Sequence, residues 1–465
     1  MRPSSLEAVD RGLPSRGRWS AFRAVTAEMS YRMATARRAA AIILVAVLGA
    51  ASVGRGAEDL AADEARVEAV VASPRFRAAM AAFERGYDRF VAELIRITEI
   101  PAPPFGEKAR ATVYLDLLRD AGLEECTMDA EGNVMGLWRG RGGGALLAVA
   151  AHLDTVFPPA TDVRVRRAGT RLFAPGVGDD GYALAFLLAL ARAMRAGGVE
   201  TAGDILFVGD VGEEGPGNLR GVRHLFGQPP WRDRIKRFIA VDGRSNDMIA
   251  NGGLGSIRYR VTLRGPGGHS WSAFGEVSPA LALGSAIAQL GRLDLRGQPK
   301  VSYNVGLLSG GTSVNSIPHE VMMEVDLRSV SAEALRKIDA DFRRIVAEAV
   351  REENAVRATT FGRITSELTL IGERPSGRTE PESPLLRQVT ATMRRFEKVP
   401  VWETTSTDAN LPMSLGIPAF AMAAHAATRA GRAHSLEEWV DVEKAHAVRD
   451  FELAAAIILT AAELP

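Results

Sequence analysis

The sequence contains very little cysteine. Cys126 is the single cysteine among 465 residues. The chain therefore cannot form an internal disulfide, and it has no second thiol with which to build a thiolate metal site. A lone cysteine is most often a small core residue, and we interpret Cys126 in that way. The chemistry of this protein has to rest on other side chains.

The chain also lacks an excess of charge of either sign. Its 57 Lys and Arg residues are balanced by 56 Asp and Glu residues, which gives a formal net charge of +1. No run of basic residues is interleaved with aromatic ones in the globular part, so we expect no binding to nucleic acid. With 46% hydrophobic residues, the chain is long enough for one large core and a second, smaller domain.

An apolar run at residues 39–53 follows Arg37 and Arg38, and a polar stretch comes after it. This order resembles an export signal. The run is shorter than the about 20 residues that span a bilayer comfortably, which favours a cleaved signal over a permanent anchor. We therefore expect residues 1–57 to be an export segment, the mature protein to be periplasmic or secreted, and no stable membrane association after signal removal. An N-terminal core helix is the alternative, but no amphipathic period runs through the segment.

The remaining chain alternates strand and helix patterns. A helical pattern at residues 76–100 stops at Pro101. Short apolar runs without alternation, typical of strands that are buried on both faces of a sheet, lie at residues 145–151, 205–208 and 238–241. The apolar segment 182–194 between the first two predicts a crossover helix. This order predicts an α/β fold with a mostly parallel sheet covered by helices.

The pattern changes near residue 255, where apolar and polar residues begin to alternate as in a half-exposed antiparallel strand. The segment that follows predicts strand, helix, strand, strand, helix and strand, which is a ferredoxin-like order. The α/β pattern then resumes with a helix near residues 384–396 and an apolar run at 419–423. The predicted domains are a catalytic domain in two parts, 58–254 and 372–465, and an inserted α+β lid or dimerisation domain, 255–371.

Polar residues follow the predicted buried strands at the point where each strand ends. His152 and Asp154 follow the first, Glu213 and Glu214 the second, and Asp242 the third. Because open α/β sheets bind ligands at the carboxyl ends of their parallel strands, we expect these groups to converge. Imidazole and carboxylate ligands suit zinc or a similar divalent ion.

The spacing of these residues suggests separate roles. Asp154 can turn toward the His152 imidazole and hold it in the metal-binding tautomer. Glycines on both sides of Glu213 and Glu214 allow a turn that brings both carboxylates into one site, where one binds metal and the other moves a proton. Asp179, in a glycine-rich loop before the crossover helix, offers a carboxylate that can bridge two ions.

Several short motifs together resemble a known family of zinc exopeptidases and amidohydrolases, which includes peptidase T, carboxypeptidase G and succinyl-diaminopimelate desuccinylase. Each motif alone is weak, but their order is specific, and the resemblance runs from about Phe76 onward. The motifs are AHLDTV, PGVGDDG, GEEGPGNLRG, AVDG, GPGGHS, GGTSVNSIP and AHSLEEW.

This resemblance implies two Zn²⁺ ions per subunit, with Asp179 as the bridging ligand. His152 and Asp242 would complete one site, Glu214 and His434 the other, and Glu213 would be the general base. Asp180 would follow Asp179 through a strained peptide and contribute little directly.

The resemblance also implies roles for the inserted domain. His269 would reach across a homodimer interface to the partner's substrate, and Asn315 and Arg328 are candidates for holding the substrate carboxylate. The chain departs from many relatives at Gly181, where they have lysine, which puts the subfamily in doubt but leaves the metal chemistry intact. The other histidines, which match no motif strongly, we interpret as structural: His224, His319, His425 and His446.

Taken singly, each of these residues has an ordinary explanation as a helix cap, a solvated turn or a packed side chain. However, the residues are all expected at one edge of the sheet, and their motifs occur in the same order as in the family. This combination favours a catalytic role over the ordinary explanations. We therefore expect a metal-dependent peptidase that hydrolyses amide bonds of short peptides. The alternatives are an N-acyl amino acid amidohydrolase with the same metal centre, or an inactive peptide-binding relative, which is disfavoured because every expected ligand and the base are present.

Overall fold

The computed structural model describes residues 59–464, so the predicted export segment, residues 1–57, lies outside the described part. The chain divides into two compact units, residues 1–62 and 63–465, and the following description concerns the second. No helix among residues 59–464 is long and apolar enough to cross a membrane.

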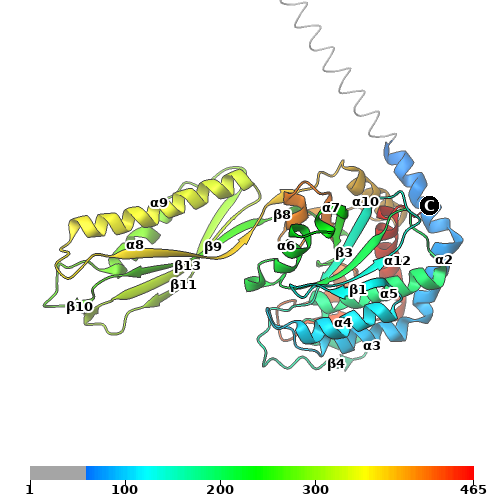
Figure 1. The fold of residues 1–465 in the computed structure, drawn as a ribbon, viewed down its shortest axis with the longest axis horizontal. Coiled ribbons are helices and arrows are strands. Elements are labelled where there is room, and N and C mark those ends of the chain that lie inside the picture. Colours follow the sequence, from blue (N-terminus) through cyan, green and yellow to red (C-terminus); the bar gives the residue numbers. More distant parts are fainter. Residues whose placement is uncertain (1–58, 465) are drawn as a thin grey trace, which may run out of the picture. The chain divides into compact units, whose positions relative to one another are not determined.

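The larger sheet of this unit has parallel strands at its centre and antiparallel strands at its edges (Figure 1). Its order is β1-β2-β6-β3-β7-β17-β8-β15, and β16 pairs with β8. Strands β6, β3, β7 and β17 run parallel to one another. The strands are β1 (Glu124–Met128), β2 (Val134–Trp138), β3 (Leu146–His152), β6 (Ile205–Asp210), β7 (Ile235–Ala240), β8 (Met248–Gly253), β15 (Gly377–Arg378), β16 (Val401–Thr405) and β17 (Ala419–Ala421). The predicted α/β class is confirmed.

Helices cover both faces of this sheet. Every residue of β3 is buried, because Ala148 and Ala150 pack in a core with α6 (Arg220–Gly227) and α11 (Asn410–Ser414) on one face. On the other face lie α4 (Lys108–Asp120) and α5 (Ala183–Gly197), the predicted crossover helix. Continuous apolar runs are needed for strands that are covered on both sides.

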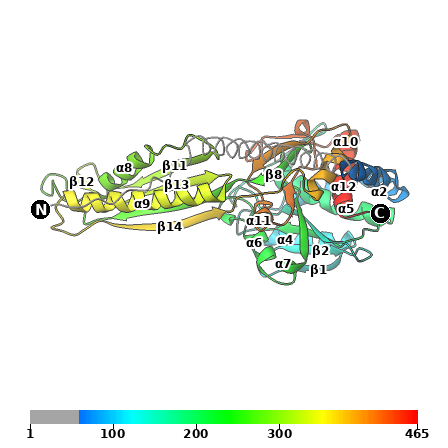
Figure 2. The same cartoon turned by 90° about the horizontal axis from the view of Figure 1, so that it is seen from above.

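The helical pattern at residues 76–100 forms two helices, which corrects the prediction of one. Helix α2 (Pro74–Arg85) begins after Ser73, whose hydroxyl accepts a hydrogen bond from the Phe76 amide, and α3 (Tyr87–Thr98) follows directly. The break falls at Gly86, which leaves the helical conformation while its amide still bonds to Ala82. Helix α2 packs near α5 and near the C-terminal helix α12 (Lys444–Ala461), which also contacts α10 (Pro384–Arg395) (Figure 2).

The inserted segment forms a four-stranded antiparallel sheet of order β11-β13-β9-β14. With two helices in the chain order strand, helix, strand, strand, helix, strand, this is the ferredoxin-like arrangement that the sequence predicted. Apolar residues such as Tyr259, Val261 and Phe342 form its core between the sheet and the helices. The elements are β9 (Gly255–Arg264), α8 (Pro279–Leu290), β11 (Val301–Gly310), β13 (Glu320–Ser329), α9 (Ala332–Val356) and β14 (Thr365–Arg374).

Two small sheets hold loops that the sequence did not predict as paired. Strand β19 (Trp439–Asp441) pairs with β18 (Ala430–Gly431) and with β5 (Arg171–Phe173), which pairs with β4 (Arg166–Ala168). This brings the C-terminal loop of residues 430–441 against the turn η1 (Val177–Tyr182). In the inserted domain, β10 (Gly268–His269) pairs with β12 (Ser316–Ile317).

Candidate metal centre

Three neighbouring strands deliver polar groups to one edge of the central sheet. His152 ends β3, in register with Asp210, which ends β6. Glu213 and Glu214 follow β6, and Asp242 follows β7, which runs parallel to β3 on its other side. Because parallel strands end at the same edge, residues distant in sequence lie together there.

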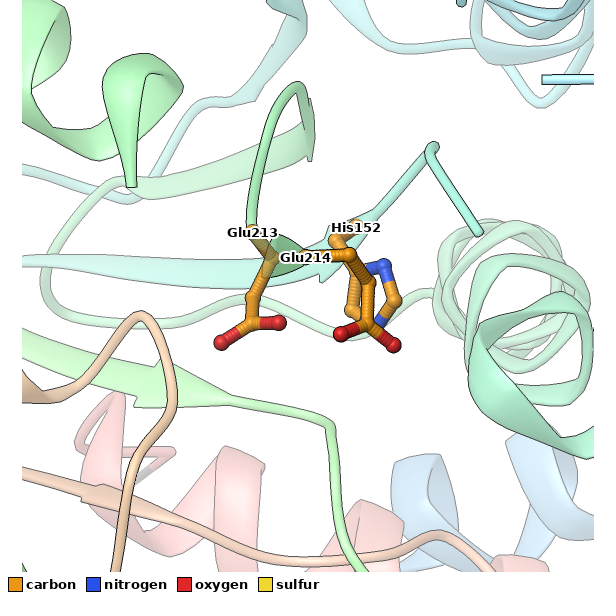
Figure 3. A group of neighbouring side chains, drawn as sticks. All are labelled: His152, Glu213 and Glu214. Carbon is orange, nitrogen blue, oxygen red and sulfur yellow. The ribbon is translucent and has the colours of Figure 1, made fainter. Parts of the chain in front are cut away.

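A tight turn after β6 brings Glu213 and Glu214 into one site. Gly212 adopts a φ of 72°, a left-handed conformation that glycine takes at little cost. Asp154 then accepts hydrogen bonds from the Glu213 amide at 3.0 Å and from the Glu214 amide at 2.9 Å. Figure 3 shows the two glutamate side chains extending to the same side as the ring of His152.

The ring of His152 is held from two sides. Its Nδ1 lies 3.6 Å from a carboxylate oxygen of Asp154, as the sequence led us to expect, and 3.0 Å from the Asp154 carbonyl oxygen. Its Nε2 lies 2.9 Å from Asp179. Burial lowers the pKa of His152, but hydrogen bonds to Asp154 and Asp179 outweigh it and hold the pKa well above its usual value. Asp154 thus contacts both the imidazole and the glutamate turn.

The loop that carries Asp179 is fixed by Glu438, a residue to which sequence reasoning gave no role. The Glu438 carboxylate accepts hydrogen bonds from the amides of Gly176 at 3.0 Å, Gly178 at 2.7 Å and Asp179 at 2.8 Å. A carboxylate that receives several convergent backbone N–H groups holds a loop in one conformation. Glu438 lies in the AHSLEEW motif, so the motif marked the segment but not this contact. The peptide bond between Asp179 and Asp180 is cis.

His434 reaches the same site from the C-terminal loop. Its Nε2 lies 2.7 Å from Glu214 and 3.2 Å from Asp179. Hydrogen bonds that the His434 ring donates to the carboxylates of Asp179 and Glu214 raise the pKa of His434 to about 10. The structure therefore brings together all five residues that the resemblance assigned as metal ligands.

The ligand atoms form groups of the size that a metal ion needs. His152, Asp179 and Asp242 form one group, and Asp179, Glu214 and His434 form another, with the atoms of each group within 4.8 Å of one another. Glu213 forms a third group with His152 and Glu214. Mixed nitrogen and oxygen donors of this kind fit zinc or another divalent ion.

The charge of the site also fits a cation. Burial raises the pKa of Glu213 to about 8, although Arg374 lowers it, and burial with the nearby Asp179 charge raises the pKa of Asp242 to about 7. Carboxylates crowded in a buried site resist ionisation because each disfavours the charge of the next. A bound divalent ion would reverse that effect.

Arg374 is a second residue that the prediction missed. It ends β14, and its guanidinium donates to a Glu213 carboxylate oxygen at 2.8 Å, to the Glu213 carbonyl oxygen and to the Ser406 hydroxyl at 3.0 Å. The side chains of Arg374 and Glu213 are 7% and 6% exposed, so this is a buried ion pair. The inserted domain was predicted to end at residue 371, three positions short of Arg374.

Behind the edge of the sheet lies a pair of buried acids, Asp210 and Asp408. Burial raises the pKa of each, and the charge of Asp210 raises that of Asp408 further. Neighbouring buried carboxyl groups disfavour each other's charged form. The sequence gave no means of recognising this pair.

A cavity of about 870 Å³ opens over the metal-ligand groups. It is lined by the six predicted ligands and base, His152, Asp179, Glu213, Glu214, Asp242 and His434, and also by Arg328. His425, which we interpreted as structural, lines it too. His269 and Asn315 do not. His269 ends β10, and Asn315 directly precedes β12, the strand that pairs with β10. Both residues are exposed. The amide of Ser270, next to His269, donates to the Asn315 carbonyl oxygen.

Comparisons with known proteins agree with this geometry. A family model described as Peptidase family M20/M25/M40 matches residues 148–463. The succinyl-diaminopimelate desuccinylase of Alkalilimnicola ehrlichii is 29% identical over 243 residues, which are 47% of this chain and 64% of that protein. The desuccinylase of Leptothrix cholodnii is 28% identical over 218 residues, 43% of this chain and 57% of that protein. The chain thus spans less than two thirds of the length of these curated relatives.

Solved structures share the fold at low sequence identity. The aminopeptidase PepT from Bacillus cereus has a TM-score of 0.66 at 20% identity, with 81% of this chain and 99% of that one covered. A tripeptidase from Staphylococcus aureus has a TM-score of 0.65 at 17% identity, with 80% and 98% covered. Because the family model matches more than half of the sequence, the chain belongs to peptidase family M20/M25/M40.

Proposed function

We propose that this protein is a dinuclear metal-dependent hydrolase that cleaves the amide bond of short peptides. The proposal rests on one observation. Asp179 belongs to both ligand groups, the one that contains His152 and the one that contains His434. One shared carboxylate between two sets of nitrogen and oxygen donors is the arrangement that two neighbouring ions need. Zinc is the metal that suits these donors best.

Two bound ions would supply Lewis-acid chemistry to the substrate carbonyl and to the attacking water. The chain's own part in the reaction falls to Glu213, whose carboxylate lines the cavity beside the ligands. As general base it takes a proton from water as the water oxygen bonds to the carbonyl carbon. It then gives that proton to the leaving nitrogen as the C–N bond breaks.

Asp154 supports this chemistry without touching the substrate. It is fully buried, and it contacts both the His152 ring and the amides of Glu213 and Glu214. A single carboxylate thereby fixes the ring orientation of one ligand and the turn that carries the base.

The decisive experiment separates the base from the ligands, because Glu213 also belongs to one possible ligand group. Glu213→Gln should keep about two metal ions by elemental analysis and lose nearly all activity, since a base acts only in the reaction. Glu214→Gln and His152→Ala should lose metal as well as activity. If Glu213→Gln releases metal as readily as these controls, the base is assigned to the wrong glutamate. Activity that survives exhaustive chelation would refute the metal mechanism altogether.

An N-acyl amino acid is the second candidate substrate. It would use the same metal centre, and the curated relatives are, by their names, enzymes that remove a succinyl group. Incubating the zinc-loaded protein with di- and tripeptides and with N-acyl amino acids, followed by mass analysis of the products, separates the two.

We further propose that the active form is a homodimer in which His269 serves the partner's site. His269 and Asn315 are exposed and outside their own chain's cavity, and nearby Trp271 and Phe274 are 86% and 85% exposed. Large exposed apolar side chains of this kind mark interaction surfaces. Mixing inactive His269→Ala with inactive Glu213→Gln should restore part of the activity. No recovery despite subunit exchange, or an active monomer, would contradict this.

We also propose that the protein is exported. This rests on the signal-like segment alone. N-terminal sequencing of native protein should find a start near residue 58, and a soluble cytoplasmic product that begins at Met1 would contradict it.

A further inference from the structure

The inserted sheet has an open face that carries a ladder of ion pairs. Helices α8 and α9 cover one face, where Tyr259 and Val261 are buried. On the opposite face, each arginine of β9 meets an acid of the neighbouring strand β13. The pairs are Arg258 with Asp326, Arg260 with Glu324, and Arg264 with Glu320.

The ion pair between Arg258 and Asp326 differs from the other two. Arg258 lines the cavity, whereas Arg260 does not. Asp326 accepts a hydrogen bond from Nε of Arg258 at 3.3 Å through one oxygen and from Nε of Arg328 at 2.6 Å through the other. One carboxylate therefore serves two guanidinium groups, both of which line the cavity.

The geometry of this ion pair leaves donors for a ligand. Both contacts to Asp326 use Nε, and the terminal nitrogens of Arg258 and Arg328 have no protein partner among residues 59–464. These terminal nitrogens are the ones that bind a carboxylate in a two-pronged arrangement. Asp326 thus fixes the two side chains and leaves their binding edges open to the cavity.

The charge around the cavity also favours an anionic ligand. Arg374 is matched by Glu213 and Arg244 by Glu403. Arg258, Arg328 and Arg432 also line the cavity, and Arg432 has no acidic partner among the described residues. Outside the metal ligands and the two ion pairs, these three guanidinium groups face the carboxylates of Asp326 and Glu438, which leaves a surplus of one positive charge.

We propose that Arg258 and Arg328, held by Asp326, form an anion-binding clamp that selects substrates with two carboxylates. The substrate class is a short peptide or N-acyl amino acid that carries a second carboxylate, from an acidic residue or a dicarboxylic acyl group. Arg258 is the specificity-determining residue, because a single bidentate arginine already satisfies one carboxylate. This inference rests on the proposed hydrolysis of amide bonds at the metal centre.

The test compares matched substrates that differ by one carboxylate, namely N-succinyl-alanine against N-acetyl-alanine and Ala-Glu against Ala-Gln. The native enzyme should show a kcat/KM at least about tenfold higher for the substrate with two carboxylates of the hydrolysed pair, since the second carboxylate adds charge-assisted hydrogen bonds to the clamp. Arg258→Gln should lower kcat/KM about 10- to 100-fold for the substrate with two carboxylates and about twofold or less for the substrate with one. Arg258→Lys should recover part of the preference.

Arg260→Gln is the matched control, because Arg260 sits on the same strand and face with an acidic partner but outside the cavity. It should leave both substrates unaffected. Thermal unfolding of each variant checks that it is folded. A native enzyme that prefers the substrates with one carboxylate, or an Arg258→Gln variant that loses activity equally toward both members of a pair, would overturn the clamp.

Binding of succinate, with acetate as the single-carboxylate comparison, gives a readout that needs no turnover. Calorimetry should show succinate binding tightly to the native and Arg260→Gln holoproteins and about tenfold or more weakly to Arg258→Gln. If no amide is hydrolysed but this dependence on Arg258 holds, the proposed function fails and the clamp stands. Equal succinate affinity in all three proteins would refute the clamp, whatever the activity.

Discussion

The two ends of the cavity are built by different kinds of strand. At the metal end, the parallel strands β3 and β6 are buried along their whole length, and their polar side chains, His152 and Asp210, occur only where each strand stops. At the arginine end, antiparallel strands of the inserted sheet alternate, so that Arg258 and Arg260 lie on one face with a buried residue between them. The first arrangement concentrates interdependent groups at one point. The second spreads similar groups along a surface, where each can be changed singly.

The largest effect is expected from the residue that both metal groups share. Asp179→Ala should remove a ligand from both groups at once, so metal content should fall toward zero and activity below detection. Elemental analysis and peptide hydrolysis measure both. Retention of one tightly bound ion would show that the two ligand groups are separable, contrary to the interdependence described for this end of the cavity.

A large effect is also expected where the two regions meet. Arg374→Ala leaves Glu213 buried without its partner, and breaking a buried ion pair in this way typically costs about 3–5 kcal/mol. We expect kcat to fall about 100-fold with metal content unchanged, because the base loses its orientation. Arg374→Lys should recover part of kcat. Parallel loss of metal and activity would mean that Arg374 supports the ligands and not the base.

An intermediate effect is expected from Glu438, which holds the Asp179 loop through three amides. Glu438→Gln should weaken metal binding about 10- to 100-fold, as is usual when a partner of a ligand is changed. The control is Glu437→Gln, because Glu437 pairs with Arg166 at an exposed position. Competition with a metal-binding dye measures the affinity. Identical affinities for the two variants would show that the loop does not depend on Glu438.

The smallest effect on chemistry is expected from the core of the inserted domain. Phe342 is fully buried there, and Phe342→Leu should cost up to about 1.5 kcal/mol of unfolding free energy, as modest changes of core volume do. Metal affinity should remain that of the native protein. Calorimetric unfolding and metal titration test this together, and a loss of metal affinity would show that the two regions are not energetically separate.

The sequence predicted best what depends on local pattern. The buried strands β3, β6 and β7 were recognisable because runs such as residues 205–208 have no polar interruption. Helix α8 was recognisable for a similar local reason, since Pro279 starts it and its apolar residues continue to Leu290. Strands β1, β2, β8 and β16, which lie outside the central parallel strands, escaped because their pattern is weak without the sheet that surrounds them.

The sequence predicted least what depends on distant contacts. The sequence pattern places Arg258 among the polar residues of an alternating strand. The alternation does not indicate which of the arginine–carboxylate pairs on that strand lines the cavity. Glu438 and Arg374 act on residues about 160 to 260 positions away in the chain. Pairing over such separations is set by tertiary packing, which periodicity does not report.

The two crossings between the domains have a mechanical consequence. Chain entry through β9 and exit through β14 lie side by side, hydrogen-bonded from Thr365 opposite Arg264 to Arg374 opposite Ser256. The two crossings are therefore held together as paired neighbouring strands and are not two independent linkers. Any swing of the inserted domain bends both strands together. Arg374 is the last residue of β14 and donates a hydrogen bond to the Glu213 carboxylate. A rotation of the inserted domain would therefore displace the carboxylate that is proposed to move the proton.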